Sequence, residues 1–115
     1  MSEHLTTREA LEELLEDLIR ESPGLVVLFT DAGCQVADAV EPKLAALLRQ
    51  EFPALRFTVV SRSDSRQLLT QMGVLAFPTV IVFFAGKETA RFTRAFSLDE
   101  VAQAIERPYG LLFGP

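Results

Sequence analysis

The chain has 115 residues, of which 49% are hydrophobic and 23% charged, so it has room for one compact domain and its composition argues against disorder. With 11 Lys and Arg against 16 Asp and Glu, its formal net charge is -5, and such a chain is not expected to bind nucleic acid or anionic membrane surfaces. Its one cysteine excludes a fold held together by an internal disulfide.

The N-terminal segment does not have the pattern of a secretory signal. Acidic residues are spread through it, so it lacks both a basic start and an uninterrupted apolar core. No apolar run in the chain approaches the roughly 20 residues that span a bilayer. We therefore expect a cytoplasmic protein.

The first predicted helix spans Thr6–Arg20, where leucines recur at helical spacing on one face and acids occupy the other. Thr6 and Glu9 fit a capping box at its start. The unbroken apolar run Leu25–Phe29 then predicts a strand that is covered on both faces.

A polar loop leads from that strand to Cys34, and a second helix is predicted over Gln35–Glu51. Pro42 lies inside this helix and predicts a kink, because its ring crowds a carbonyl one turn earlier and its nitrogen cannot donate a hydrogen bond. A strand over Leu55–Val60 and a short helix over Asp64–Met72 follow.

Two more strands are predicted after Gly73, a residue that stands where a helix often ends in a left-handed glycine. Thr79–Phe84 is an apolar run, and Glu88–Arg94 alternates enough to be its hairpin partner. The turn between them, Ala85–Lys87, is too short for a parallel crossover. It therefore favours a mixed sheet over a doubly wound parallel sheet.

The last predicted helix opens at Ser97, which forms a second capping box with Glu100, and it ends at Pro108. We interpret residues 1–106 as a single domain and residues 107–115 as an apolar C-terminal tail. Two interpretations of the tail stay open. It packs over the domain's own surface, or it docks onto a partner or a second copy.

The predicted order α-β-α-β-α-β-β-α gives an α/β fold with a mixed four-stranded sheet and helices on both faces. The first strand ends at Phe29, five residues before Cys34, and Pro42 follows Cys34 by eight residues. The segment Gly73–Thr79 ends in Phe-Pro-Thr before a strand, and Gly86 lies in the hairpin turn. In this order and at these separations the features resemble the thioredoxin family, over residues 24–106.

The resemblance implies a thioredoxin-like fold in which the Phe77–Pro78 peptide is cis and lies beside Cys34, although the rarity of cis bonds alone favours a trans peptide. It also implies that Cys34 is the attacking nucleophile. The residues that it implies for binding an extended substrate are Gly33, Phe77, Pro78 and Thr79.

Several departures from the family's pattern fall in this site. Ala37 occupies the position of the resolving cysteine, and Gly33 that of a tryptophan. Leu28 and Val59 stand where the family has a buried acid and its lysine partner, and Asp38 where a basic residue is common. A self-contained dithiol reductase is therefore not expected, because release of the product from a mixed disulfide needs a second thiol.

The nucleophile in disulfide exchange is the thiolate, and the sequence predicts opposing influences on the ionisation of Cys34. A helix N-terminus favours the anion, whereas Asp31 and Asp38 disfavour it as like charges. No basic residue is near Cys34 in sequence, so we expect a less reactive thiol than that of a dithiol enzyme. Four arginines elsewhere could form a local basic face, but we interpret them as scattered surface charges: Arg62, Arg66, Arg91 and Arg94.

Two hypotheses of function belong to different classes. In the first, the chain is a monothiol redox protein: Cys34 attacks a protein or small disulfide, and an outside thiol, such as glutathione or a partner's cysteine, releases the product. In the second, the chain is a non-catalytic module that binds a protein partner through the groove between Cys34 and Pro78. Either protein is expected to be a monomer or a weak dimer.

No cofactor is expected from these residues. Cys34 is not expected to ligate an iron–sulfur cluster as monothiol glutaredoxins do, because the sequence lacks their Cys-Gly-Phe-Ser motif and their glutathione-binding residues. Zinc sites in proteins need three or four ligands, and Cys34 with His4 does not supply them.

Overall fold

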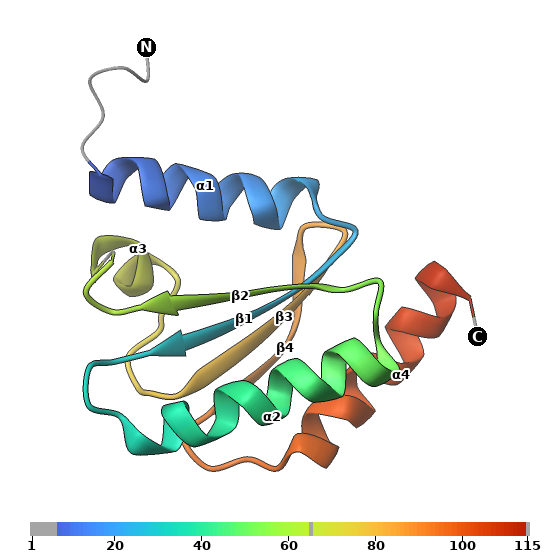
Figure 1. Ribbon diagram of the computed structural model, residues 1–115. Helices are drawn as coiled ribbons and strands as arrows, with labels where there is room; N and C mark the ends of the chain where they lie inside the picture. Colours follow the sequence, from blue (N-terminus) through green and yellow to red (C-terminus); the bar gives the residue numbers. More distant parts are fainter. Residues whose placement is uncertain (1–6, 65, 115) are drawn as a thin grey trace.

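The computed structural model describes the backbone of residues 7–64 and 66–114 and the side chains of residues 10–64 and 66–114. Thr6 and the side chain of Glu9, which form the first predicted capping box, lie outside these ranges. The order of elements is confirmed (Figure 1): α1 (Thr7–Glu21), β1 (Gly24–Thr30), α2 (Gln35–Glu51), β2 (Arg56–Ser61), α3 (Arg66–Gln71), β3 (Thr79–Phe84), β4 (Lys87–Thr93) and α4 (Leu98–Phe113).

The four strands form one mixed sheet in the order β2-β1-β3-β4. β1 pairs with β2 in parallel, across the connection that α2 makes, and with β3 in antiparallel. β3 and β4 form a hairpin, and its turn residues Ala85 and Gly86 have φ of 52° and 79°. Left-handed values at both positions are typical of the type I′ turn, which joins two hairpin strands through two residues. The mixed sheet predicted from that turn is confirmed.

Helices cover both faces of the sheet, with α2 and α4 on one face and α1 and α3 on the other (Figure 1). The side chains of β1 alternate between the two layers. Val26 and Leu28 pack with α2 and α4, whereas Val27 and Phe29 pack with α1 and α3. All four are fully buried, and every residue of β3 is buried too. The two central strands therefore carry the core of both layers, which explains their unbroken apolar sequences.

The last helix is longer than predicted. It begins with the predicted capping box, but the prediction that Pro108 ends it is wrong, because α4 continues to Phe113. Pro108 leaves one carbonyl of the preceding turn without its helical donor. Beyond it, Tyr109 and Phe113 lie one turn apart and pack against the core beside Phe52. These tertiary contacts extend the helix past the proline, so most of the predicted tail belongs to α4.

We expect Tyr109→Ala to lower the free energy of unfolding by about 2 kcal/mol, less than truncation of a fully buried ring, because Tyr109 is only partly buried. Its ring lies 5.2 Å from that of Phe52, and its hydroxyl accepts the N–H of Ala54 at 3.1 Å. Leu111→Ala is the matched control on the same helix. Leu111 is 81% exposed, so its loss is expected to stay within about 0.5 kcal/mol. Urea unfolding measures both, and equal losses would contradict the packing role of Tyr109.

Candidate functional site

Three segments meet at one end of the sheet because of the strand registers. Phe29 pairs with Thr79, and Thr30 pairs with Ser61. The loop after β1, the residues after β2 and the loop before β3 therefore lie next to one another, and α3 lies at the same end (Figure 1). The first of these segments carries Cys34.

Cys34 is the N-cap residue of α2, with φ of -79° and ψ of 97°. Its N–H donates to the carbonyl of Asp31 at 3.1 Å, and its carbonyl accepts the N–H of Asp38, also at 3.1 Å. Gly33 precedes it with φ of 74°, a left-handed conformation that glycine adopts without strain. The side chain of Cys34 is half-buried and makes no capping hydrogen bond. The backbone of Cys34 is thus fixed at the helix N-terminus, while its thiol makes no hydrogen bond to the helix.

The loop before β3 is held by hydrogen bonds on both sides of Pro78. The Phe77–Pro78 peptide is cis, and the carbonyl of Pro78 accepts the N–H of Arg94 at 2.8 Å. The hydroxyl of Thr79 donates to the carbonyl of Ala76 at 2.7 Å. Pro78 and Thr79 are buried and Phe77 is half-buried. Of the groove residues predicted on this loop, only Phe77 therefore offers accessible side-chain surface to a ligand.

The two acids predicted to act on Cys34 have different surroundings. Asp31 accepts the N–H of Ala32 at 2.8 Å with one carboxylate oxygen, and the other oxygen lies 3.3 Å from the guanidinium of Arg62. Asp38 is exposed in the first turn of α2. Sequence reasoning missed Arg62 because it lies 31 residues from Asp31. The signal that could have found it is the parallel pairing of β1 and β2, which brings the residues after both strands together.

Arg91 holds the beginning of the loop before β3 from its place on β4. Its guanidinium donates to the carbonyls of Met72 and Gly73, at 2.8 and 3.1 Å, and forms an ion pair with Glu88. The hydrogen bond from Arg91 holds the pKa of Glu88 below its usual value and raises the pKa of Arg91 itself. Arg62 and Arg91 lie at the surface, but neither is an isolated charge, since each also contacts a loop of this site.

The positions that lack the second thiol and the acid–lysine pair are apolar. Ala37 and Leu28 are fully buried, and Val59 lies at the surface of β2. None of these side chains can accept a proton from Cys34. A proton that leaves this thiol must therefore pass to solvent, to another nearby side chain or to a group on a substrate.

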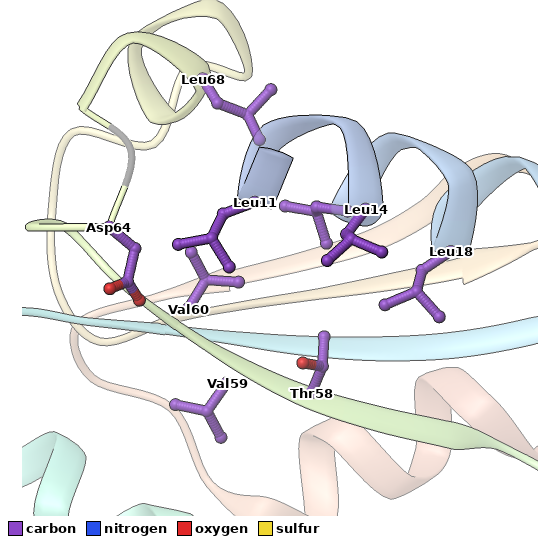
Figure 2. A pocket seen from close by; sticks show the side chains of 9 residues that line it. Leu11, Leu14, Leu18, Thr58, Val59, Val60, Asp64 and Leu68 are labelled. Carbon is purple, nitrogen blue, oxygen red and sulfur yellow. The ribbon is translucent and has the colours of Figure 1, made fainter. Parts of the chain in front are cut away.

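An apolar groove of about 180 Å³ lies elsewhere, between α1 and the edge strand β2. Figure 2 shows side chains of α1 pointing across it toward β2: Leu11, Leu14 and Leu18 face Thr58 and Val60. Leu14 is 60% exposed. Neither Cys34 nor the Phe77–Pro78 loop contributes to its walls, so this groove is separate from the Cys34 site.

Within the described ranges, no three His, Cys, Asp or Glu side chains gather in a way that could hold a metal ion. His4, considered above as a zinc ligand, lies outside those ranges. None of the helices in the described part of the chain is long and apolar enough to cross a membrane.

Known proteins share this fold and part of this sequence, although no protein-family model matches the chain. The mitochondrial thioredoxin 3 of Saccharomyces cerevisiae superposes with a TM-score of 0.73 at 22% identity, over 82% of this chain and 87% of that one. The thioredoxin-like protein YdfQ of Bacillus subtilis is 26% identical over 100 residues, which cover 87% of this chain and 88% of YdfQ. The chain has a thioredoxin-like fold and is similar in sequence to a thioredoxin-like protein.

The chain also matches thioredoxin domain-containing protein 15 of Homo sapiens, at 34% identity over 67 residues. The match covers 58% of this chain but 18% of the human protein, so the likeness is confined to a part of that relative. The thioredoxin-like fold that the sequence resemblance implied is confirmed, and the relatives that share part of the sequence are thioredoxin-like as well.

Proposed function

We propose that this protein carries out monothiol thiol–disulfide exchange with Cys34 as the nucleophile. The observation that supports this most is the placement of the thiol, half-buried at the N-terminus of α2 and without a hydrogen bond to the helix. Backbone N–H groups in the first turn of a helix favour an anion at this position. Ala37 supplies no second thiol, so the cycle is completed from outside the chain.

The proposed cycle has two steps of the same kind. The Cys34 thiolate attacks one sulfur of a substrate disulfide, a bond forms between the two sulfurs, and the other substrate sulfur leaves as a thiolate with the electron pair of the broken S–S bond. The thiolate of an external thiol, for which we propose glutathione, then attacks the substrate sulfur of this mixed disulfide. Cys34 leaves as a thiolate, and a new disulfide forms between the substrate and the external thiol.

The surrounding residues have separate roles in this proposal. Gly33 adds no side chain that would cover the thiol, and Phe77 contacts an extended substrate segment. Pro78 and Thr79 are buried, so they shape the loop that presents Phe77. Asp31 and Asp38 add negative charge near the N-terminus of α2, and Arg62 offsets the charge of Asp31. The cytoplasm suits this cycle, because thiols there are kept reduced.

The test is the transfer of a glutathionyl group from glutathione disulfide, followed by intact-mass spectrometry. We expect one adduct per chain, formed on Cys34 and faster in the native protein than in the urea-unfolded protein, where the thiol has lost its helix. Reduced glutathione should then remove the adduct. Cys34→Ser is the control and should form none. A native thiol that reacts more slowly than the unfolded one would overturn the proposal.

A second candidate function is protein binding through the same loops, without chemistry at Cys34. The observation that favours it is Leu75, which is 80% exposed on the loop that leads to Phe77. An exposed apolar side chain of this size suits the centre of a protein interface. A folded protein with an inert Cys34 would favour this function over exchange.

A further inference from the structure

A pocket of about 250 Å³ opens between α3 and the loop before β3, at the end of the sheet that carries Cys34. Its polar lining comes from two arginines and one threonine, Arg62, Arg66 and Thr70. Leu75 and Phe77 contribute apolar surface at its wall. No acidic side chain is among the described residues that line it, so the charged groups in this lining are positive.

The two guanidinium groups have donors to spare. Arg66 enters no ion pair within residues 10–64 and 66–114, and Arg62 contacts Asp31 through a single nitrogen at 3.3 Å. Each guanidinium has five N–H donors in a planar fork that matches the two oxygens of a carboxylate. A carboxylate on a short carbon chain therefore complements both the charge of this pocket and its apolar wall.

Arg62 also connects the pocket to the thiol. Its backbone N–H donates to the carbonyl of Thr30 at 2.8 Å, and its guanidinium contacts Asp31. The carbonyl of that same Asp31 accepts the N–H of Cys34. Phe77 lines the pocket on the loop that leads into β3. A ligand in the pocket thus lies next to Arg62, which also contacts the loop that carries Cys34.

We propose that this pocket binds the carboxylate of the thiol or disulfide that reacts with Cys34. Arg62 and Arg66 donate to the carboxylate, and Leu75 and Phe77 contact the carbon chain attached to it. The identity of the reacting group rests on the proposed exchange function, whereas binding of the carboxylate does not. An acidic residue of a peptide and a small acidic thiol such as glutathione share this chemistry.

The kinetic test compares two disulfide reagents on the same thiol, the dianionic dithiobis(nitrobenzoate) and the uncharged dithiodipyridine. The ratio of their second-order rate constants is independent of the intrinsic reactivity of Cys34. We expect Arg66→Gln to lower this ratio about fivefold, the effect of one exposed ion pair at its upper range. Arg66 is preferred to Arg62 because Arg62 also contacts Asp31.

The matched control is Arg94→Gln, which removes the same charge at the same end of the sheet but outside the pocket. We expect it to leave the ratio within about twofold of the wild type, because exposed charges that are not in contact are screened by salt. A ratio that falls equally in both variants, or in neither, would overturn the pocket proposal.

The binding test uses isotope-labelled Cys34→Ser protein, in which exchange cannot occur. S-methylglutathione and the capped peptide acetyl-Ala-Glu-Ala-amide are titrated separately, and amide shifts are followed over residues 62–77. Amide shifts that are seen in the Cys34→Ser protein and disappear when Arg66→Gln is added to it support the proposal. The ligand that causes these shifts identifies the source of the carboxylate. If neither ligand causes amide shifts, or if the shifts persist in the Arg66→Gln variant, the proposal is overturned. If Cys34 reacts with neither disulfide reagent, the exchange function fails while this binding test still decides the pocket.

Discussion

Ala37→Cys is expected to let the introduced thiol release the substrate group from the mixed disulfide on Cys34. The expected rate is about a hundredfold above that given by an external thiol held near ten micromolar. A thiol on a short tether acts at an effective concentration in the millimolar range, which is the origin of that factor. The variant thus supplies from within the chain the step that the proposed cycle takes from glutathione.

The geometry of α2 supports this expectation. Cys34 is the N-cap, and Ala37 is the third residue of the helix, so their side chains meet over the first turn. Ala37 is fully buried, which places an introduced sulfur beneath Cys34 and away from solvent. The extra atom costs about 1–3 kcal/mol through crowding of the core, so the fold of the variant is verified by circular dichroism.

The measurement is the decay of a preformed adduct between Cys34 and a glutathionyl group, followed by mass spectrometry at low external thiol. Val36→Cys is the matched control, because it also adds one thiol to the first turn of α2. Val36 is 55% exposed and lies two residues from Cys34, a spacing at which helical side chains do not face each other. A folded Ala37 variant that decays no faster than the Val36 variant would contradict the placement of the thiol over the helix.

Features of the fold set by short stretches of sequence could be predicted. The unbroken apolar run in β1 identifies a central strand, because each of its faces must be covered. The short turn between β3 and β4 identifies a hairpin, and Ala85 and Gly86 adopt the left-handed conformation of a type I′ turn. Ser97 and Glu100 identify the start of α4, since both hydrogen bonds of the capping box are local.

Features that depend on contacts between distant residues were not predictable in the same way. The extension of α4 past Pro108 follows from the packing of Tyr109 on Phe52, a contact that no local pattern indicates. The same is true of the site, where Arg62 reaches Asp31 only because β1 and β2 pair in parallel. The position of Cys34 at a helix N-terminus was predicted, but the charges that surround it come from the tertiary structure.

Phe29→Ala is expected to lower the free energy of unfolding by about 3–5 kcal/mol, as truncation of a fully buried aromatic ring does. Phe29 is fully buried near the end of β1, in the layer that also contains α1 and α3. A domain of ordinary stability has about 5–15 kcal/mol in total, so the variant is expected to lie close to its unfolding threshold. Phe29→Leu is the conservative control, with an expected loss below about 1.5 kcal/mol.

The cavity left by Phe29→Ala should also affect the two layers of the protein unequally. Phe29 shares its core cluster with Leu69 of α3 and with Phe77, whereas Val101 of α4 lies in the cluster on the other face of the sheet. We therefore expect amide hydrogen exchange to accelerate more over residues 68–77 than over α4, because local opening needs only the contacts of one layer. Equal acceleration of hydrogen exchange in both layers would show that the two layers open together and not independently. The loop that carries Phe77, at the same end of the sheet as Cys34, would then depend on the stability of the whole domain rather than on the layer beneath it.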